Sequence, residues 1–259
     1  MKNILLLIFI FTISSYAASQ NYIINGKLSG WVSCIDDWQL GLRYIPEFHM
    51  SSIVGKQKKV DFEFSLNAYT NGKFSSLEDF QDNANLKLYR SWIRYSTSQF
   101  ESRLGLQKIN FGPARILRSL MWFDKTDVRD PLEIADGVKA FLMRYYFLNN
   151  SNIWSWFLYG NDDLKGLETF KTDKDRMEYG ARVQYPIPKA EIAVTFHNRK
   201  IDKEDYETEM DESISNGCEN RFSIDANLDI ELGFWFEAVA SQIKIDKNSS
   251  FWQEFLTIG

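Results

Sequence analysis

The stretch from Phe100 to Tyr146 decides the fold: FESRLGLQKINFGPARILRSLMWFDKTDVRDPLEIADGVKAFLMRYY. A strand-like run at 100–109 enters a long segment rich in Arg, Asp and aromatic residues, and a second run at 137–147 leaves it. Apolar and polar residues alternate in both runs, which places them on opposite faces of a strand. The polar face of the two runs carries Arg103, Gln107 and Arg144. This alternation is typical of a wall between lipid and water, and the segment between suits a loop folded into a pore mouth.

The same period of two recurs along the rest of the chain. Val60 to Ala68, Arg176 to Tyr185 and Arg221 to Leu228 are clear examples, and in a less regular run we expect Trp154, Trp156 and Leu158 on the outer face. The runs have about ten residues, the length that a tilted strand needs to cross a membrane, whereas strands in soluble sheets usually have about half as many. The pattern predicts an all-β, antiparallel, up-and-down transmembrane β-barrel with about 11–12 strands present. The alternative is a soluble β-sandwich or jelly roll, which also alternates.

Short and long links interleave between the predicted strands, as they do in outer-membrane barrels with tight periplasmic turns and longer outside loops. We expect all five prolines to lie in links or at strand ends. The short links are expected near 34–36, 96–98, 149–151, 186–188 and 228–230. The long links are expected at 46–59, 70–85, 110–136, 161–175, 200–219 and 243–250, with an eyelet-like loop at about 110–136.

The first residues are typical of a signal peptide, which we place at 1–19. Lys2 provides a positive start, Ile4 to Ile13 is an apolar core too short to span a bilayer, and small residues follow at a cleavage site. We therefore expect an exported protein of the outer membrane of a Gram-negative bacterium, with the barrel domain at 20–259. Because the chain ends at Gly259 early in a strand-like run, we expect this domain to be the N-terminal part of a longer barrel.

Composition narrows the function classes. The formal net charge of −5 gives no indication of a nucleic-acid partner, and an aromatic content of 15% suits girdles at two membrane interfaces. Cys34 and Cys218 either form one disulfide or remain free thiols. The partners expected are outer-membrane lipid and small hydrophilic solutes, with the oligomeric state left open.

Arginines are concentrated around the long loop, and two hypotheses account for them. Rings of basic side chains favour anionic solutes in a pore, whereas arginines that pair with Glu101, Asp124 and neighbouring acidic residues would hold the loop against the wall. The two are compatible. The candidate pore-lining or eyelet residues are Arg90, Arg94, Arg103, Gln107, Arg115, Arg118, Asp124, Arg129, Asp130 and Arg144.

Signs of catalysis are few, so we predict that the protein is not an enzyme and needs no cofactor or metal. The two histidines, His49 and His197, accompany no nucleophile elbow and no zinc-ligand spacing. The acidic segment from Asp202 to Glu219 does not have the spacing of a calcium loop. An outer-membrane enzyme would require a Ser–His pair that the sequence does not present.

Several motifs resemble uncharacterised porin-like outer-membrane proteins of Bacteroidota-type bacteria. They are RLGLQKINFG at 103–112, LRSLMWFD at 117–124, VRDP at 128–131, DGV at 136–138, ENRFSID at 219–225 and GFWFE at 233–237. The resemblance covers most of the chain after the signal segment, departs from the family at the C-terminus, and implies a porin-like barrel without naming a solute.

The expected function is passive diffusion of small hydrophilic solutes, with anions favoured by the arginine-rich loop. The alternative is a non-transporting outer-membrane barrel that acts as a surface binding or structural protein with a plugged interior. Bulky side chains decide between the two, because a plug would be favoured if they pointed inward. The residues concerned are Trp92, Tyr146, Phe157 and Trp235.

Overall fold

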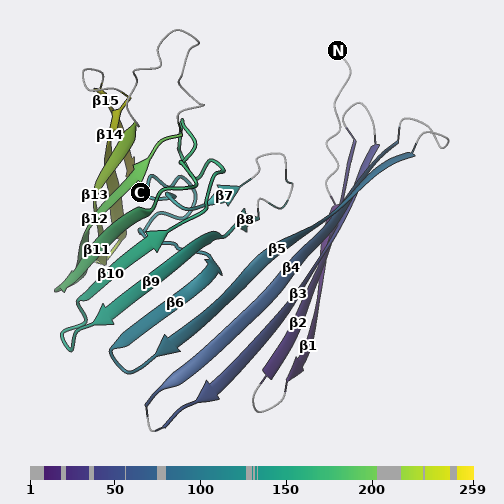
Figure 1. Ribbon diagram of the computed structural model, residues 1–259, viewed down its shortest axis with the longest axis horizontal. Coiled ribbons are helices and arrows are strands. Elements are labelled where there is room, and N and C mark those ends of the chain that lie inside the picture. Colours follow the sequence, from purple (N-terminus) through teal and green to yellow (C-terminus); the bar gives the residue numbers. More distant parts are fainter. Residues whose placement is uncertain are drawn as a thin grey trace. The chain divides into compact units, whose positions relative to one another are not determined.

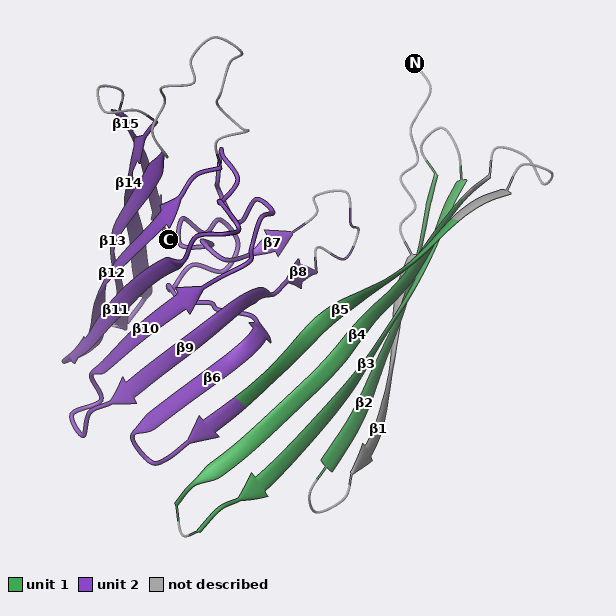
Figure 2. Cartoon of the chain, viewed as in Figure 1, with its two compact units in different colours: residues 1–93 green, residues 94–259 purple. Residues whose placement is uncertain are grey.

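The computed structural model describes residues 9–18, 22–34, 38–55, 57–74, 80–126, 130, 132, 134–202, 217–229, 231–245 and 250–259. The chain divides into two compact units, Met1–Ile93 and Arg94–Gly259 (Figure 2). Each is built from antiparallel strands. The described residues contain no helix long and apolar enough to cross a membrane.

The first unit contains strands that lie side by side in chain order (Figure 1). The first, β1, covers part of the predicted signal segment and pairs with β2 from Phe9↔Val32 to Ala18↔Ile23; the signal peptide itself stays a prediction. The strand β5 ends within the second unit. The strands are β1 (Phe9–Ala18), β2 (Tyr22–Cys34), β3 (Trp38–Ile53), β4 (Lys59–Phe74) and β5 (Phe80–Ser96).

The second unit also follows chain order, β6-β9-β10-β11-β12-β13-β14-β15, and a small ladder of β7 and β8 lies within its longest link. The prediction of an all-β, antiparallel, up-and-down architecture is confirmed. The strands are β6 (Phe100–Gln107), β7 (Lys125–Thr126), β8 (Ala135–Asp136), β9 (Val138–Tyr146), β10 (Asn152–Leu158), β11 (Glu178–Ile187), β12 (Ala190–Lys200), β13 (Cys218–Asp229), β14 (Gly233–Lys244) and β15 (Ser250–Ile258).

The sheet of the second unit has two contrasting faces. Along β12, Thr195, His197 and Arg199 are buried, whereas Ile192 and Val194, which precede them on the opposite face, are exposed. We call the face with the buried polar side chains the inner face and the opposite one the outer face. Soluble proteins usually bury apolar side chains and leave charged ones in water, so this distribution is inverted.

Large apolar side chains cover the outer face of the second unit from β9 to β15. Cross-strand register places them beside one another, as in the row Val183↔Val194↔Ile224. Soluble monomers rarely expose contiguous apolar patches larger than a few hundred Å². The side chains of this face include Phe141, Tyr145, Ile153, Phe157, Tyr179, Val183, Tyr185, Ile192, Val194, Phe222, Ile224, Phe234, Leu256 and Ile258.

The first unit shows the same inversion on its own. Along β3, Leu40, Leu42 and Tyr44 are exposed, whereas Gly41 and Arg43 are buried. The guanidinium of Arg43 lies 5.1 Å from the centroid of the Tyr69 ring on the neighbouring strand β4. The polar face of this unit is therefore also partly covered by its own side chains.

The predicted links lie where expected in the second unit, and in the first unit the short link near 34–36 is also found, between β2 and β3. Short and long links alternate between β5 and β14, with long ones at 108–137, 159–177 and 201–217. In the first unit the expected long loops at 46–59 and 70–85 are replaced by continuing strands, because β3 runs to Ile53 and β4 to Phe74. Pro46 therefore lies within β3, opposite Gly26, and not in a link.

The phase of β10 is also opposite to the prediction. Trp156 and Leu158 are fully buried on the inner face, and Phe157 faces outward instead. The reason is that the long loop supplies apolar partners on the inner side, so large apolar residues are buried there as well. Phe157 therefore does not belong to any plug.

Candidate functional site: the inner face of the second unit

The long link after β6 folds onto the inner face and makes the main apolar core of the unit. The ring of Phe111 stacks on that of Trp156 at 5.5 Å between centroids and 21° between planes, and Trp122 meets Phe111 edge-on at 5.6 Å. This packing fixes the loop on the sheet, because buried aromatic pairs contribute area and a defined geometry. The core comprises Ile109, Phe111, Leu120, Trp122, Phe123, Val138, Ala140, Leu142, Trp156, Leu158 and Val239.

Glu237 on β14 holds the loop at two points. Its carboxylate oxygens accept hydrogen bonds from the backbone N–H groups of Ala114 and Leu120, both at 3.0 Å, and its side chain is fully buried. Gly112 permits this approach, because it has φ +90° and a Cβ there would lie 2.4 Å from Glu237 Oε1. The segment 115–119 between the two anchored residues is thereby presented as a rigid tip.

Arg118 and Ser119 secure the rest of the tip. Arg118 Nη1 donates to Asp124 Oδ2 at 2.5 Å, and its Nη2 lies close to Asn110 Oδ1. The hydroxyls of Ser119 and Thr257 are hydrogen-bonded to one another. The prediction that acidic residues would pair with the loop arginines is confirmed for Arg118 and Asp124.

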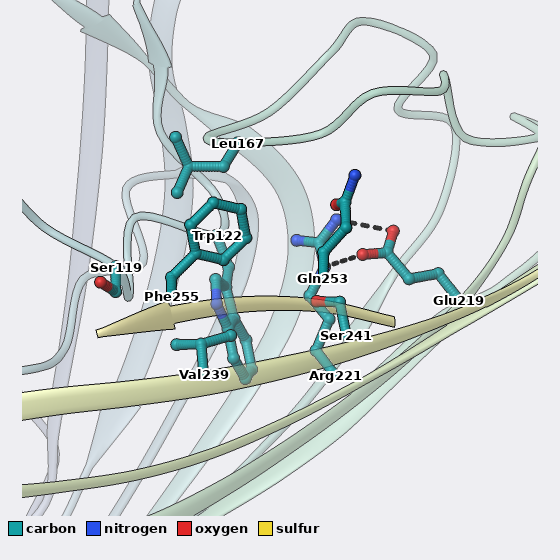
Figure 3. Close-up of a pocket in the computed structure, with 9 residues that line it drawn as sticks. All are labelled: Ser119, Trp122, Leu167, Glu219, Arg221, Val239, Ser241, Gln253 and Phe255. Atoms are coloured by element: carbon teal, nitrogen blue, oxygen red, sulfur yellow. Dashed lines mark hydrogen bonds and ion pairs between the residues drawn. The ribbon is translucent and has the colours of Figure 1, made fainter. Parts of the chain in front are cut away.

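A second link, 159–177, packs beside the first. The N–H of Gly166 donates to the carbonyl of Asp124 at 2.7 Å, and Gly166 has φ +53° with Met121 O 2.0 Å from where its Cβ would lie. Figure 3 shows Leu167 and Trp122, one from each link, around the same small space as Arg221. That space is about 10 Å³, room for roughly one water molecule and not for a solute.

An ionic network lies under the second link. Arg199 Nη2 lies 2.6 Å from Glu219 Oε2, and Arg221 Nη2 lies 3.0 Å from Glu168 Oε1. Arg199 also donates to Thr172 Oγ1 at 2.9 Å. Because these charges are almost completely buried, each depends on its partners to offset the loss of hydration.

Lys165 and Glu178 extend this network toward β10. Lys165 Nζ lies 3.1 Å from Glu178 Oε1, and Glu178 Oε2 lies 3.3 Å from His197 Nε2. His197 Nδ1 accepts a hydrogen bond from Trp156 Nε1 at 3.2 Å. With the previous pairs, three cations face three carboxylates, so the network is balanced in charge and serves to hold the 159–177 link.

A buried ion pair between β11 and β13 completes the wall. Arg182 donates to both oxygens of Asp225, at 2.7 and 2.8 Å, and to Thr195 Oγ1 at 2.9 Å. The paired fork geometry is the strong form of an Arg–carboxylate contact. Its guanidinium also lies 5.2 Å from the centroid of the Phe111 ring, which connects the wall to the first loop.

Three of the predicted pore arginines converge on one carboxylate. Glu101 Oε1 lies 3.0 Å from Arg103 Nη2 and 3.8 Å from Arg144 Nη1, and Glu101 Oε2 lies 3.9 Å from Arg94 Nη1. The guanidinium of Arg144 stacks on Trp154 at 3.8 Å from the ring centroid. We call Arg94, Arg103 and Arg144 the arginine cluster; its three side chains gather around Glu101 and remain partly exposed.

The other predicted site residues lie apart from this cluster. Gln107 is fully buried and its Nε2 donates to the Ala140 carbonyl at 2.9 Å, which bridges β6 and β9. Arg115 lies on the exposed tip of the anchored loop.

Arg90 belongs to the first unit, is buried, and donates to the carbonyl of Tyr89 at 2.6 Å. Asp130 Oδ1 accepts from the N–H of Leu132 at 3.1 Å, and Arg129 lies outside the described residues.

Sequence reasoning missed the buried network and the Glu237 anchor. The alternation of polar and apolar residues placed Glu178, Arg182 and Glu237 on the polar face, and this was the only sequence pattern that pointed to the network and the anchor. It gave no sign that the side chains of Lys165 and Glu168, within the polar segment NDDLKGLETF, would be buried against the inner face.

Cys34 and Cys218 are both free thiols. Within the part of the chain that the structure describes, no group of three or more His, Cys, Asp and Glu side chains is placed to hold a metal ion. No protein-family model, curated protein or solved structure matches the chain.

Proposed function

We propose that the chain forms the wall of an outer-membrane β-barrel that lets small hydrophilic solutes diffuse passively, with anions favoured. In this proposal the strands close into a barrel, the outer face contacts lipid, and the inner face lines the interior. The signal segment at 1–19 directs export, and the porin-like resemblance of the loop motifs is consistent with the same class.

The observation that carries the proposal is the inverted distribution of side chains across the sheet. The outer face carries mainly large apolar side chains, and the inner face holds ion pairs such as Arg182–Asp225. This is the arrangement of strands that separate lipid from an aqueous interior, in which lipid-facing and interior-facing residues alternate. A soluble sandwich would place the apolar face against a second layer.

The anion preference is supported by the arginine cluster. Its three guanidinium groups lie around Glu101, so basic side chains are concentrated at this part of the wall. Rings of basic side chains attract anions into a narrow pore and repel cations. The field is strongest at low ionic strength, because the screening length shortens from roughly 30 Å at 0.01 M salt to roughly 10 Å at 0.1 M.

Single-channel recording in planar bilayers tests the proposal. The full chain, folded from detergent into the bilayer, is expected to give stepwise conductance with a reversal potential biased toward the anion in a potassium chloride gradient. Arg103→Gln and Arg144→Gln should each reduce that bias, whereas Arg176→Gln should leave it unchanged, because Arg176 lies in the 159–177 link and is largely exposed.

A second candidate is a non-conducting barrel that acts as a surface binding or structural protein. It is favoured by the apolar core that the folded loop makes on the inner face, with Trp156, Leu142 and Val138 fully buried. This candidate would be supported, and the channel contradicted, by a protein that folds in the bilayer but passes no current. Folding would be seen as a difference in gel mobility between unheated and heated samples.

A further inference from the structure

The tip of the anchored loop exposes apolar side chains in an unusual place. Ile116 is 92% exposed and Leu117 is 75% exposed, although the residues on either side are held to the strands by Glu237 and by the hydrogen bond between Ser119 and Thr257. A tip held rigidly cannot turn these side chains into a core of its own. Keeping them in water therefore has a lasting free-energy cost that burial against a ligand would remove.

A cavity of about 520 Å³ lies against this tip. Loop residues form one side of it and the ends of β13, β14 and β15 form the other. The volume falls within the range of roughly 300–1,000 Å³ found for small-molecule sites. Its walls include Arg115, Ile116, Leu117, Asn227, Trp235 and Thr257.

The lining chemistry selects one class of ligand. Ile116, Leu117 and the half-buried ring of Trp235 offer apolar surface, whereas Asn227 and Thr257 are the uncharged polar groups. Arg115 supplies a charge, and no Asp or Glu is among the residues that line the cavity. A sugar would need many hydrogen-bonding partners, so this lining suits a solute with an apolar body and one anionic group.

Two carboxylates on the neighbouring strands, those of Glu237 and Asp225, are engaged with other partners. Both oxygens of Glu237 accept backbone N–H groups of the loop. Asp225, on the neighbouring inner row, forms its fork-shaped pair with Arg182. Arg115 itself has no ion pair among the residues described, which leaves its guanidinium available for a carboxylate, the group whose geometry it matches.

We propose that this cavity binds small organic anions with an apolar body, such as aryl or branched alkyl carboxylates. The carboxylate contacts Arg115, and the body lies between Trp235 and the Ile116–Leu117 tip. The inference deepens the proposed function by naming a solute class, and it rests on that function for the route by which the solute arrives. The binding step itself requires no conductance.

Isothermal titration of the full chain, folded in detergent micelles, tests the inference with 3-phenylpropanoate as the probe. Comparison ligands are 3-phenylpropanamide, which lacks the charge, and glucose, which lacks the apolar body. We expect the acid to bind and the amide to bind roughly ten-fold more weakly, because hydrogen bonds between ions are the stronger ones.

Two variants localise the site without threatening the fold, since both side chains are exposed. Arg115→Gln should weaken binding of the acid roughly ten-fold while leaving binding of the amide unchanged. Leu117→Ser should weaken acid and amide alike, and Arg176→Gln is the matched control that should alter neither.

Equal affinity for acid and amide, tighter binding of glucose, no binding at all, or an unaltered affinity in Arg115→Gln would each overturn the inference. These outcomes are separate from those of the bilayer recording. Binding without conductance would support the site and contradict the channel alone. An anion-biased conductance without binding would support the channel and contradict the site alone.

Discussion

Glu237 is the residue on which the position of the loop depends most. Its two carboxylate oxygens each accept a hydrogen bond from a backbone N–H group of the loop. Because the side chain is fully buried, no water can replace these contacts. A buried N–H that loses its acceptor keeps the desolvation cost without the bond, roughly 1–3 kcal/mol. Small changes at this position should therefore release the whole tip.

Replacing Glu237 by Gln should loosen the loop while preserving the shape of the site. The amide group can accept from one of the two N–H groups but presents its own NH₂ to the other, so we expect a loss of about 2 kcal/mol of unfolding free energy. Trypsin cleavage after Arg115 and Arg118 should become faster. Glu231→Gln, at an exposed position before the same strand, is the control, and equal cleavage rates in both variants would contradict the anchor.

Gly112→Ala addresses the same anchor from the loop side. Here φ is +90° and the added methyl group would meet Glu237 Oε1, so strain alone should cost about 1–3 kcal/mol. Gly233→Ala is the matched control, because its Cβ would meet nothing within 4 Å. Urea unfolding of the two variants in phospholipid vesicles measures the difference, and a loss that is as large in Gly233→Ala would speak against a special role for Gly112.

At the scale of elements, the strands of the second unit provide a frame and two links are fastened to it. The first link is held mainly by apolar packing and the second mainly by ions. Since Lys165 and Glu178 are both almost completely buried and 3.1 Å apart, removing one partner leaves an uncompensated charge, whereas removing both does not.

A double-mutant cycle should reveal this coupling. Lys165→Met alone is expected to cost about 3–5 kcal/mol of unfolding free energy, and Lys165→Met combined with Glu178→Gln should cost less than the single change. Hydrogen exchange of the amides in the 159–177 link gives an independent measure. Additive effects of the two substitutions would show that the pair does not act as a unit.

The elements were predicted from sequence better than the contacts between them. Alternation in residues such as Glu178, Arg182 and Glu237 identified the strands and their polar face, because a two-residue period is a local property of the chain. The phase of Trp156 was wrong, since only the folded loop makes the inner face apolar there. The burial of Lys165 and the cavity beside Arg115 depend on residues distant in sequence, which no local pattern encodes.

For the whole molecule, the decisive property is the medium that the outer face meets. Val194 is 57% exposed and lies between Val183 and Ile224, both also exposed. In water an exposed position of this kind accepts a charged residue at a cost within about 0.5 kcal/mol. In the hydrocarbon layer an arginine on a barrel strand costs about 2–4 kcal/mol at the midplane.

Val194→Arg should therefore reduce the free energy of folding into phospholipid vesicles by about 2–4 kcal/mol. Val194→Leu should have little effect. The folded fraction can be followed by the shift in gel mobility between unheated and heated samples, across a urea series. If the arginine variant folds as well as the leucine variant, the outer face does not contact lipid and the membrane assignment fails.

The anchor at Glu237 also sets an order of events during folding. Neighbouring strands of the second unit are close in sequence, so each hairpin can form as soon as its two strands exist. Ala114 and Glu237, by contrast, are 123 positions apart, and contacts between distant positions form late because the intervening chain must first be ordered. The loop tip can be seated only after β14 has joined its neighbours, which makes its docking a late step in the formation of the interior.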